Sequence, residues 1–247
     1  LIYSEGWFDQ PQWTLEQAQE AKLDHICRDL QFQAGQNYLD IGCGWGALIS
    51  HAAGRFGVHA VGCTLSHGQY EYATALVRSL GLDHRVQIAE MDYRDLPGRF
   101  DRISSIGMFE HVGRHRLGEY FRRMHRMLEP GGRFVNSGIS RPQDVRDDPQ
   151  TRFLLSRVFP GAELAHLSDV IREAEHAGFS ILDLRNLRGD YARTCREWVA
   201  NLKSSRDRCI SLVGEEAWRT WLLYLAASAC SFEKGESEVF SIVMTRQ

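Results

Sequence analysis

The sequence predicts an α/β protein built on a mostly parallel sheet with helices on both of its faces. Short apolar segments alternate with amphipathic segments over the first 140 residues. A glycine-rich turn, Gly42-Cys-Gly-Trp-Gly46, joins the first apolar segment to the helix that follows it. Glycines also follow the predicted helices, as at Gly81, where they are typical end signals. Strands that alternate with helices at this spacing indicate parallel pairing, with each helix crossing over the sheet.

Local signals justify the elements in order. Thr14 and Gln17 have the spacing of a capping box, so we expect the first helix over residues 14–30. Apolar, strand-like segments follow, each bounded by turn residues. Strands are predicted at 37–42, 59–64, 86–91, 100–106 and 133–139. Helices are predicted at 47–56, 68–80 and 116–128, the last stopped by Pro130-Gly-Gly.

The pattern changes after residue 139. Residues 140–165 are polar and contain three prolines, which favours a lid inserted after the fifth strand. Beyond the lid we expect a helix at 169–177, a strand at 179–187, a helical stretch at 197–229 broken near Gly214, and a last strand at 239–245. No linker or repeat divides the chain, so we predict one domain over 1–247. Within it, 140–170 and 190–235 would cover the substrate.

Composition excludes several classes of protein. The 247 residues are 43% apolar and 25% charged, which is ordinary for a folded domain and rules out disorder as the main state. The net charge of −3 argues against a general nucleic-acid binder. The longest apolar run is about ten residues, whereas a membrane span needs about 20. The six cysteines lack zinc-like spacing, so we expect no metal, reduced thiols and a cytoplasmic protein.

Two cofactors compete for the glycine-rich turn, beside the simpler interpretation as an ordinary strand-to-helix turn. A dinucleotide site uses G-x-G-x-x-G/A, which Gly42, Gly44 and Ala47 satisfy loosely. That site also needs an acid at the end of the second strand, where this chain has Cys63-Thr-Leu-Ser66. The dinucleotide interpretation is therefore the weaker of the two.

An acid inside the turn favours S-adenosylmethionine instead. Asp40 precedes the first glycine in the pattern D-x-G-x-G-x-G, where its carboxylate can meet the ammonium of the methionine moiety. Asp92 and Tyr93 follow the third strand and offer a carboxylate beside an aromatic face for the adenine. The sequence therefore predicts S-adenosylmethionine as the cofactor.

Seven short motifs occur in a fixed order along nearly the whole chain. They are Tyr3-Ser4, Leu39-Asp-Ile-Gly-Cys-Gly-Trp-Gly46, Thr64-Leu-Ser-x-x-Gln69, Asp92-Tyr-Arg94, Met108-Phe-Glu-His-Val-Gly113, Phe159-Pro-Gly161 and Tyr191-Ala-Arg-Thr194. The ordered set resembles the cyclopropane-fatty-acyl-phospholipid synthases and the mycolic acid cyclopropane synthases. This resemblance implies a class I methyltransferase fold, a Rossmann-like seven-stranded sheet with a helical lid after the fifth strand.

The resemblance also implies a reaction and a cofactor site. The double bond of an unsaturated acyl chain attacks the methyl group of the cofactor, and a carbocation forms. A base then removes a proton from the added methyl group, and a cyclopropane ring closes. The residues expected to line the cofactor site are Tyr3, Ser4, Asp40, Gly42, Gly44, Thr64, Leu65, Gln69, Asp92 and Tyr93.

The family holds a bicarbonate ion as the base, and this chain departs from that pattern. Glu110, Ile139 and Tyr191 match positions that bind the ion, but the family's cysteine is Glu5 here and its histidine is Ser137. One hypothesis is that the Glu5 carboxylate occupies the place of bicarbonate, with the small side chain at position 137 making room. The other is that Glu5 is a solvated residue near the chain start.

Two rival functions stay open. His111 follows Glu110, and related small-molecule N-methyltransferases use a Glu-His pair at this place, although His111 could equally be a structural histidine. The expected acceptor is therefore either an unsaturated acyl lipid or another small molecule. A lipid- or cofactor-binding relative without catalysis is the other rival. Peripheral membrane contact and a homodimer are also open, and the basic side chains that could face anionic headgroups are Arg114, Arg116, Arg122 and Arg123.

Overall fold

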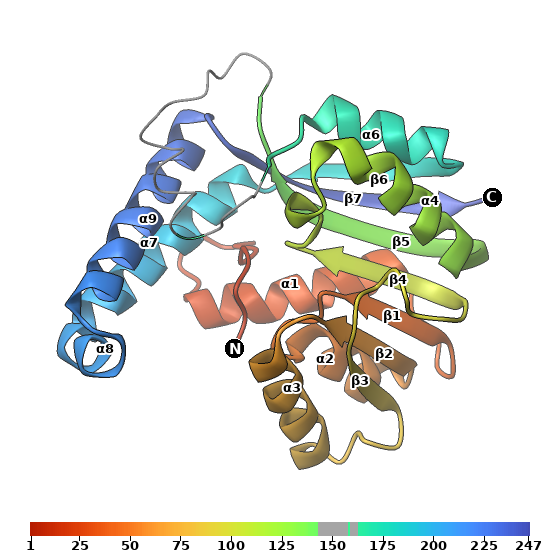
Figure 1. The fold of residues 1–247 in the computed structure, drawn as a ribbon, viewed down its shortest axis with the longest axis horizontal. Helices are drawn as coiled ribbons and strands as arrows, with labels where there is room; N and C mark the ends of the chain where they lie inside the picture. The colour runs from red at the N-terminus through yellow and green to blue at the C-terminus, as the bar shows by residue number, and fades with distance from the viewer. Residues whose placement is uncertain (143–157, 159–162) are drawn as a thin grey trace.

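A seven-stranded sheet forms the centre of the computed structural model, which describes residues 1–142, 158 and 163–247 (Figure 1). Its strand order is β3-β2-β1-β4-β5-β7-β6. The strands are β1 (Asn37–Ile41), β2 (His59–Thr64), β3 (Val86–Glu90), β4 (Phe100–Ile106), β5 (Leu128–Ser140), β6 (Phe179–Asn186) and β7 (Glu238–Arg246). β1 to β5 pair in parallel, and β7 runs antiparallel between β5 and β6. The predicted mostly parallel sheet is thus confirmed.

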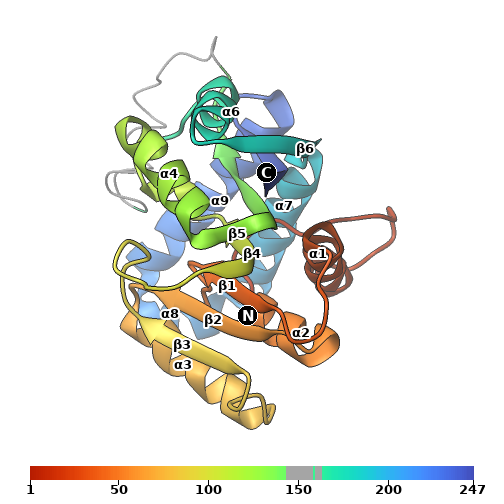
Figure 2. The same cartoon turned by 90° about the vertical axis from the view of Figure 1, so that its right-hand side faces the viewer.

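Helices cover both faces of the sheet, as predicted. Figure 2 shows α1 and α2 on one side of the sheet and α4 and α6 on the other. The helices are α1 (Leu15–Leu30), α2 (Ala47–Phe56), α3 (His67–Ser79), α4 (Leu117–Met127), α6 (Leu167–His176), α7 (Arg188–Ser204), α8 (Arg206–Val213) and α9 (Glu215–Lys234). A separate apolar core therefore forms on each face of the sheet. Val135 packs in one and Phe134 in the other, because successive strand residues point to opposite faces.

The helix starts follow their local signals. Thr14 caps α1, and both hydrogen bonds of the predicted capping box with Gln17 are formed. All six cysteines are free thiols. Within the described residues, no helix combines the length and apolar character that crossing a bilayer requires.

Two predicted boundaries were wrong. β5 begins at Leu128 rather than at residue 133, because Leu128 pairs with Phe100 before the register shifts and Arg133 pairs with Arg102. The helical stretch expected from residue 197 begins at Arg188, directly after β6. The predicted lid falls largely on residues 143–157 and 159–162, which lie outside the described part, as does the Phe159-Pro-Gly161 motif.

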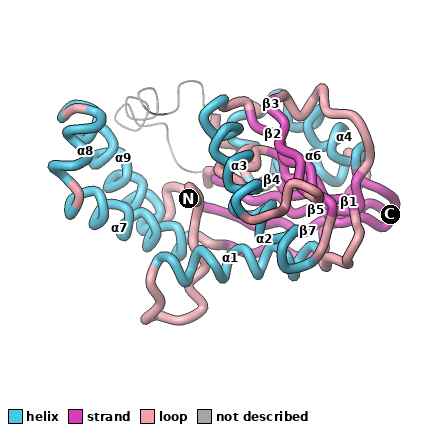
Figure 3. The backbone as a smooth tube through the Cα atoms, turned by 90° about the horizontal axis from the view of Figure 1, so that it is seen from below, coloured by secondary structure: helices cyan, strands magenta, loops and turns pink. Residues whose placement is uncertain are grey.

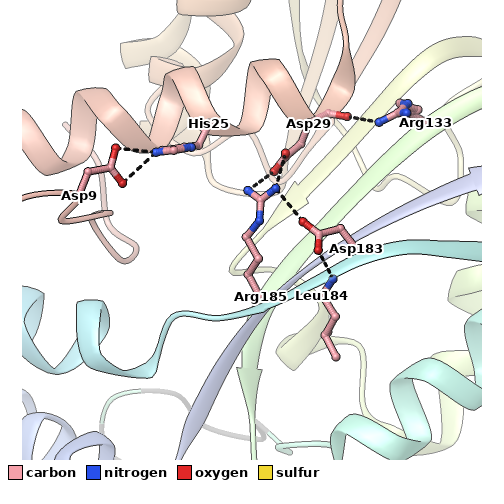
Figure 4. A network of polar contacts seen from close by, with 7 residues as sticks. All are labelled: Asp9, His25, Asp29, Arg133, Asp183, Leu184 and Arg185. Atoms are coloured by element: carbon pink, nitrogen blue, oxygen red, sulfur yellow. Dashed lines mark hydrogen bonds and ion pairs between the residues drawn. The ribbon is translucent and has the colours of Figure 1, made fainter.

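A polar network fastens α1 across the sheet (Figure 4). Both terminal guanidinium nitrogens of Arg185, on β6, donate to the Asp29 carboxylate at 3.0 Å. Arg185 also pairs with Asp183 at 2.7 Å, and Arg133 donates to the Asp29 carbonyl at 2.9 Å. These bonds fix the C-terminal end of α1 against β5 and β6.

Helices α7, α8 and α9 project from one end of the sheet, and the N-terminus lies between them and the strands (Figures 1 and 3). Gly6 donates its N–H to Thr194 Oγ1 at 2.9 Å, and Phe8 donates its N–H to Asp190 at 2.8 Å. The N-terminal segment is therefore held between α1 and α7, although it forms no helix or strand itself.

Candidate active site

A cavity of about 670 Å³ opens at the carboxyl ends of the strands. Its wall is made by the turns after β1, β2, β3 and β4, the N-terminal segment, and the inner faces of α7 and α9. Open α/β sheets bind ligands at this edge, and the volume lies in the range of ligand pockets. The turn after β1 is therefore one wall of a larger site.

The glycines of this turn have different roles. Gly42 and Gly44 have φ values of +71° and +55°, which L side chains rarely adopt. A Cβ at Gly42 would come within 3.0 Å of the Met108 side chain, whereas one at Gly44 would meet no atom closer than 4.0 Å. Since Gly44 lines the cavity, its missing side chain leaves room for a ligand to approach the backbone.

Asp40 presents a buried carboxylate to the same cavity. Asp40 is 3% exposed, and Ser104 Oγ donates to its Oδ1 at 2.6 Å. Burial raises the pKa of Asp40 to about 6, against the opposing effect of its bonds to Ser104 and Tyr38. A cationic ligand group would compensate this buried charge, as the ammonium of S-adenosylmethionine would.

The turns after β2 and β3 contribute polar groups. Thr64 Oγ1 donates to Gln69 Oε1 at 2.7 Å, which joins the end of β2 to the first turn of α3. The exposed Leu65 side chain lines the cavity beside them. After β3, Arg94 donates to both oxygens of Asp92, at 2.9 and 2.7 Å. Tyr93 lies in the cavity wall with its ring edge-on to a buried tyrosine.

Glu110 stands at the centre of the expected catalytic group. Its Oε1 accepts the Ile139 N–H at 2.7 Å, while its Oε2 is buried without a hydrogen-bond partner among the described residues. Burial, with a smaller effect from Glu5, raises the pKa of Glu110 to about 7. Gly138 makes this approach possible, because a Cβ there would overlap the Phe109 ring and lie 2.8 Å from Glu110 Oε1.

The two departures from the family pattern contact each other. Ser137 Oγ donates to Glu5 Oε1 at 3.0 Å, although 132 positions separate the two residues. Glu5 is 2% exposed and Ser137 is 1% exposed, so Glu5 is not a solvated residue at a frayed terminus. Neither is among the residues that line the cavity, whereas Glu110 and Ile139 are. Glu5 therefore lies in the protein interior near Glu110.

The remaining expected residues also reach the cavity. Tyr191 lines it from α7 and stacks on Phe232 with ring centroids 4.7 Å apart. Tyr3 stacks on Trp198 at 5.1 Å. His111 follows Glu110 in the short 3₁₀ turn Phe109–His111 and lies in the cavity wall.

The basic side chains expected to face lipid headgroups differ in what they contact. Of the four basic residues proposed to face headgroups, Arg114 pairs with Asp169 at 2.9 Å, and Arg123 donates to a backbone carbonyl. Arg116 lines the cavity. No cluster of three or more His, Cys, Asp or Glu side chains that could hold a metal ion occurs in the part of the chain that the structure describes.

Sequence reasoning missed Lys22, on α1. This side chain is 2% exposed, lines the cavity and donates to Ser4 Oγ at 2.6 Å. A signal was present, because Lys22 lies four residues from both Ala18 and Ile26, on the apolar stripe of the helix. A lysine on such a stripe is buried and needs a partner.

Comparison with known protein families places the whole arrangement in context. A family model described as "Mycolic acid cyclopropane synthetase" matches residues 1–242. The chain is 39% identical over 252 residues to "Probable fatty acid methyltransferase" of Pseudomonas putida, covering all of this chain and 64% of that protein. It is 32% identical over 257 residues to "S-adenosylmethionine-dependent methyltransferase UmaA" of Mycobacterium tuberculosis, covering all of this chain and 90% of that protein.

Solved structures agree with the fold. The chain is similar to mycolic acid cyclopropane synthase CmaA1 complexed with SAH and CTAB, with a TM-score of 0.95, 30% identity, and coverage of 99% of this chain and 90% of that one. The cyclopropane synthase MmaA2 from Mycobacterium tuberculosis gives a TM-score of 0.95 at 28% identity, with the same coverage. These findings confirm the resemblance and the class I methyltransferase fold that the sequence predicted.

Proposed function

Because this chain belongs to the mycolic acid cyclopropane synthetase family, we propose that it adds a methylene bridge to the double bond of an unsaturated acyl chain. Family members are S-adenosylmethionine-dependent methyltransferases, which confirms the predicted cofactor and enzyme class. The chain spans 64% of the Pseudomonas relative, so the acceptor and product are part of the proposal.

The residues present fit the cofactor. Asp40 offers a buried carboxylate in the cavity wall to an ammonium group, and Gly44 leaves open space beside the backbone. Tyr93 supplies an aromatic face at the end of β3. When bound, S-adenosylmethionine supplies an electrophilic methyl group to the acceptor.

The proposal rests on the Glu110 carboxyl, which is buried in the wall of a cavity lined by aromatic side chains. Among the described residues, only one of its two oxygens has a hydrogen-bond partner. Its pKa of about 7 lets Glu110 take up and release a proton near neutral pH. Tyr191, Trp198 and Tyr224 line the cavity from α7 and α9, and aromatic faces stabilise a nearby carbocation. Glu110 can then accept the proton that the added methyl group loses when the ring closes.

We further propose that Glu5 replaces the family's bicarbonate. A carboxylate is the nearest protein equivalent of that ion, and a tethered group avoids the entropic cost of binding a diffusing one. Support comes from the bond of Glu5 to Ser137, since the two exchanged positions satisfy each other. Glu110 lines the cavity and Glu5 does not, so Glu110 accepts the proton in this proposal. Glu5 acts on the reaction through its charge, which helps to raise the pKa of Glu110.

Mass spectrometry of acyl chains tests the reaction. The purified protein, given S-adenosylmethionine and phospholipid vesicles with unsaturated chains, should increase the mass of those chains by one CH₂ group. Proton NMR of the product distinguishes a ring from a methyl branch. The Glu110→Gln variant should bind the cofactor and form no product. The absence of any gain with wild-type protein on all acyl acceptors would contradict the proposal.

A second candidate follows from His111, which lies beside Glu110 in the cavity wall. This pair could instead orient an amine, and the function would then be N- or C-methylation of a small molecule. Incubation with amine acceptors in the same assay separates the two functions. Absence of transfer to either class would favour a non-catalytic binding protein.

A further inference from the structure

Lys22 places a third buried ionisable group beside the two buried glutamates. It lies on α1, is 2% exposed, and lines the cavity. Its Nζ donates to Ser4 Oγ at 2.6 Å, directly before Glu5 in the chain. Burying an ammonium group costs several kcal/mol unless an opposite charge compensates it. The buried ammonium of Lys22 is therefore stable only if a nearby carboxylate compensates its charge, and the same holds for a buried carboxylate near Lys22.

We propose that Lys22 is a positioning residue that balances the buried Glu5 carboxylate and fixes the Ser4-Glu5 segment against the cavity. This inference rests on the proposed function for its effect on turnover, while the placement of Lys22 beside the Ser4-Glu5 segment stands on the fold alone. The charge of Lys22 offsets that of the Glu5 carboxylate through the interior. Glu110 is then the carboxyl that exchanges a proton near neutral pH.

The electrostatics agree with this arrangement. Burial lowers the pKa of Lys22 to about 8, and Glu5 is the charged group that opposes the decrease. Glu5 also contributes to the raised pKa of Glu110. The other charged or titratable groups that line the same cavity include Asp40, Asp92, Arg94, Glu110, His111, Arg116, Glu119, Tyr191 and Tyr224. Asp40 and Glu110 are buried like Lys22, so Lys22 is the buried cation that shares this cavity with buried acids.

A neutral neighbour provides a matched control. Gln19 precedes Lys22 by three residues on α1, is buried, and donates to the Ser4 carbonyl at 2.8 Å. Both side chains hold the same residue from the same helix, but only Lys22 carries a charge. Lys22→Met removes an anchor and the charge, whereas Gln19→Met removes an anchor alone.

Two measurements test the inference. NMR titration of the Lys22 side chain should give a pKa near 8 in the wild type, and in Glu5→Gln this pKa should fall by about one pH unit because the attraction is lost. This experiment needs no substrate, so its outcome is independent of the proposed reaction. An unchanged Lys22 titration in Glu5→Gln would overturn the inference.

The pH profile of turnover is the second measurement. Wild-type kcat should decline above about pH 8, where Lys22 loses its proton. Lys22→Met should be at least tenfold slower and lack this decline, while Gln19→Met should keep it. A Lys22→Met profile parallel to that of Gln19→Met would reduce Lys22 to a structural anchor. Lack of turnover by the wild type would refute the proposed function and leave the NMR result standing.

Discussion

Glu110→Gln should change how the stability of the protein depends on pH. The wild-type carboxyl is 6% exposed, and burial raises its pKa from the ordinary 4.5 to about 7. Between these values the unfolded chain has released the proton that the folded protein still binds. The folded state therefore loses stability as pH rises through this window. Glutamine has no such proton, so the variant escapes this loss.

The size of the effect follows from the pKa. A rise from 4.5 to about 7 corresponds to about 3 kcal/mol, at about 1.4 kcal/mol for each pH unit. The variant should thus gain up to about 3 kcal/mol relative to the wild type between pH 4.5 and pH 8. For a chain of this length this equals about 6–12 °C in Tm. The glutamine amide in the variant does not titrate, so any stability it costs is the same at every pH and cancels when the two pH profiles are compared.

Thermal unfolding of both proteins by circular dichroism, in steps from pH 4.5 to pH 8, measures this difference. Other buried groups, such as Asp40 and Lys22, titrate in both proteins and cancel to first order. Glu175→Gln, at an exposed position of α6, controls for the removal of a carboxylate that is not buried. A difference in Tm between the wild type and Glu110→Gln that stays constant across the whole range would refute the reasoning.

Three further predictions concern the cofactor, the base and the lipid surface. Gly44→Val should lower the affinity for SAH more than tenfold in calorimetry, because the valine side chain enters the cavity. Gly35 also has a positive φ but lies in open space away from the site, so Gly35→Val should bind SAH normally. Both variants should fold, since a left-handed residue costs about 1–2 kcal/mol; normal binding by Gly44→Val would exclude the assigned cofactor site. Wild-type activity should be the same with and without bicarbonate, and Glu5→Gln should be inactive. The double variant Glu5→Cys/Ser137→His should acquire bicarbonate dependence, whereas bicarbonate stimulation of the wild type would contradict the proposal that Glu5 replaces the ion. Arg116→Ala should weaken co-sedimentation with anionic vesicles about fivefold at low salt, because a basic side chain near such a surface contributes about 1 kcal/mol. Arg114→Ala, whose guanidinium already pairs with Asp169, should have little effect, and the lack of any salt-sensitive vesicle binding by the wild type would favour a soluble acceptor.

Local patterns in the sequence determined most of the fold. The alternation of strands and helices, the turn from Gly42 to Gly46, and the cap at Thr14 each depend on neighbouring residues only. Backbone sterics, helix periodicity and capping act over a few positions, so a single sequence reveals them. The order of the motifs identified the family for the same reason, since each motif is short and contiguous.

The tertiary structure decided what distant residues do together. The sequence could name Glu5 and Ser137 as departures from a family, but only the fold brings them to 3.0 Å across 132 positions. It also moved the start of β5 to Leu128, through pairing with β4. Lys22 looked like an ordinary charge on a helix until its burial beside Ser4 and Glu5 gave it a role. Desolvation and Coulomb interactions depend on which groups share an interior, and the sequence order does not contain that information.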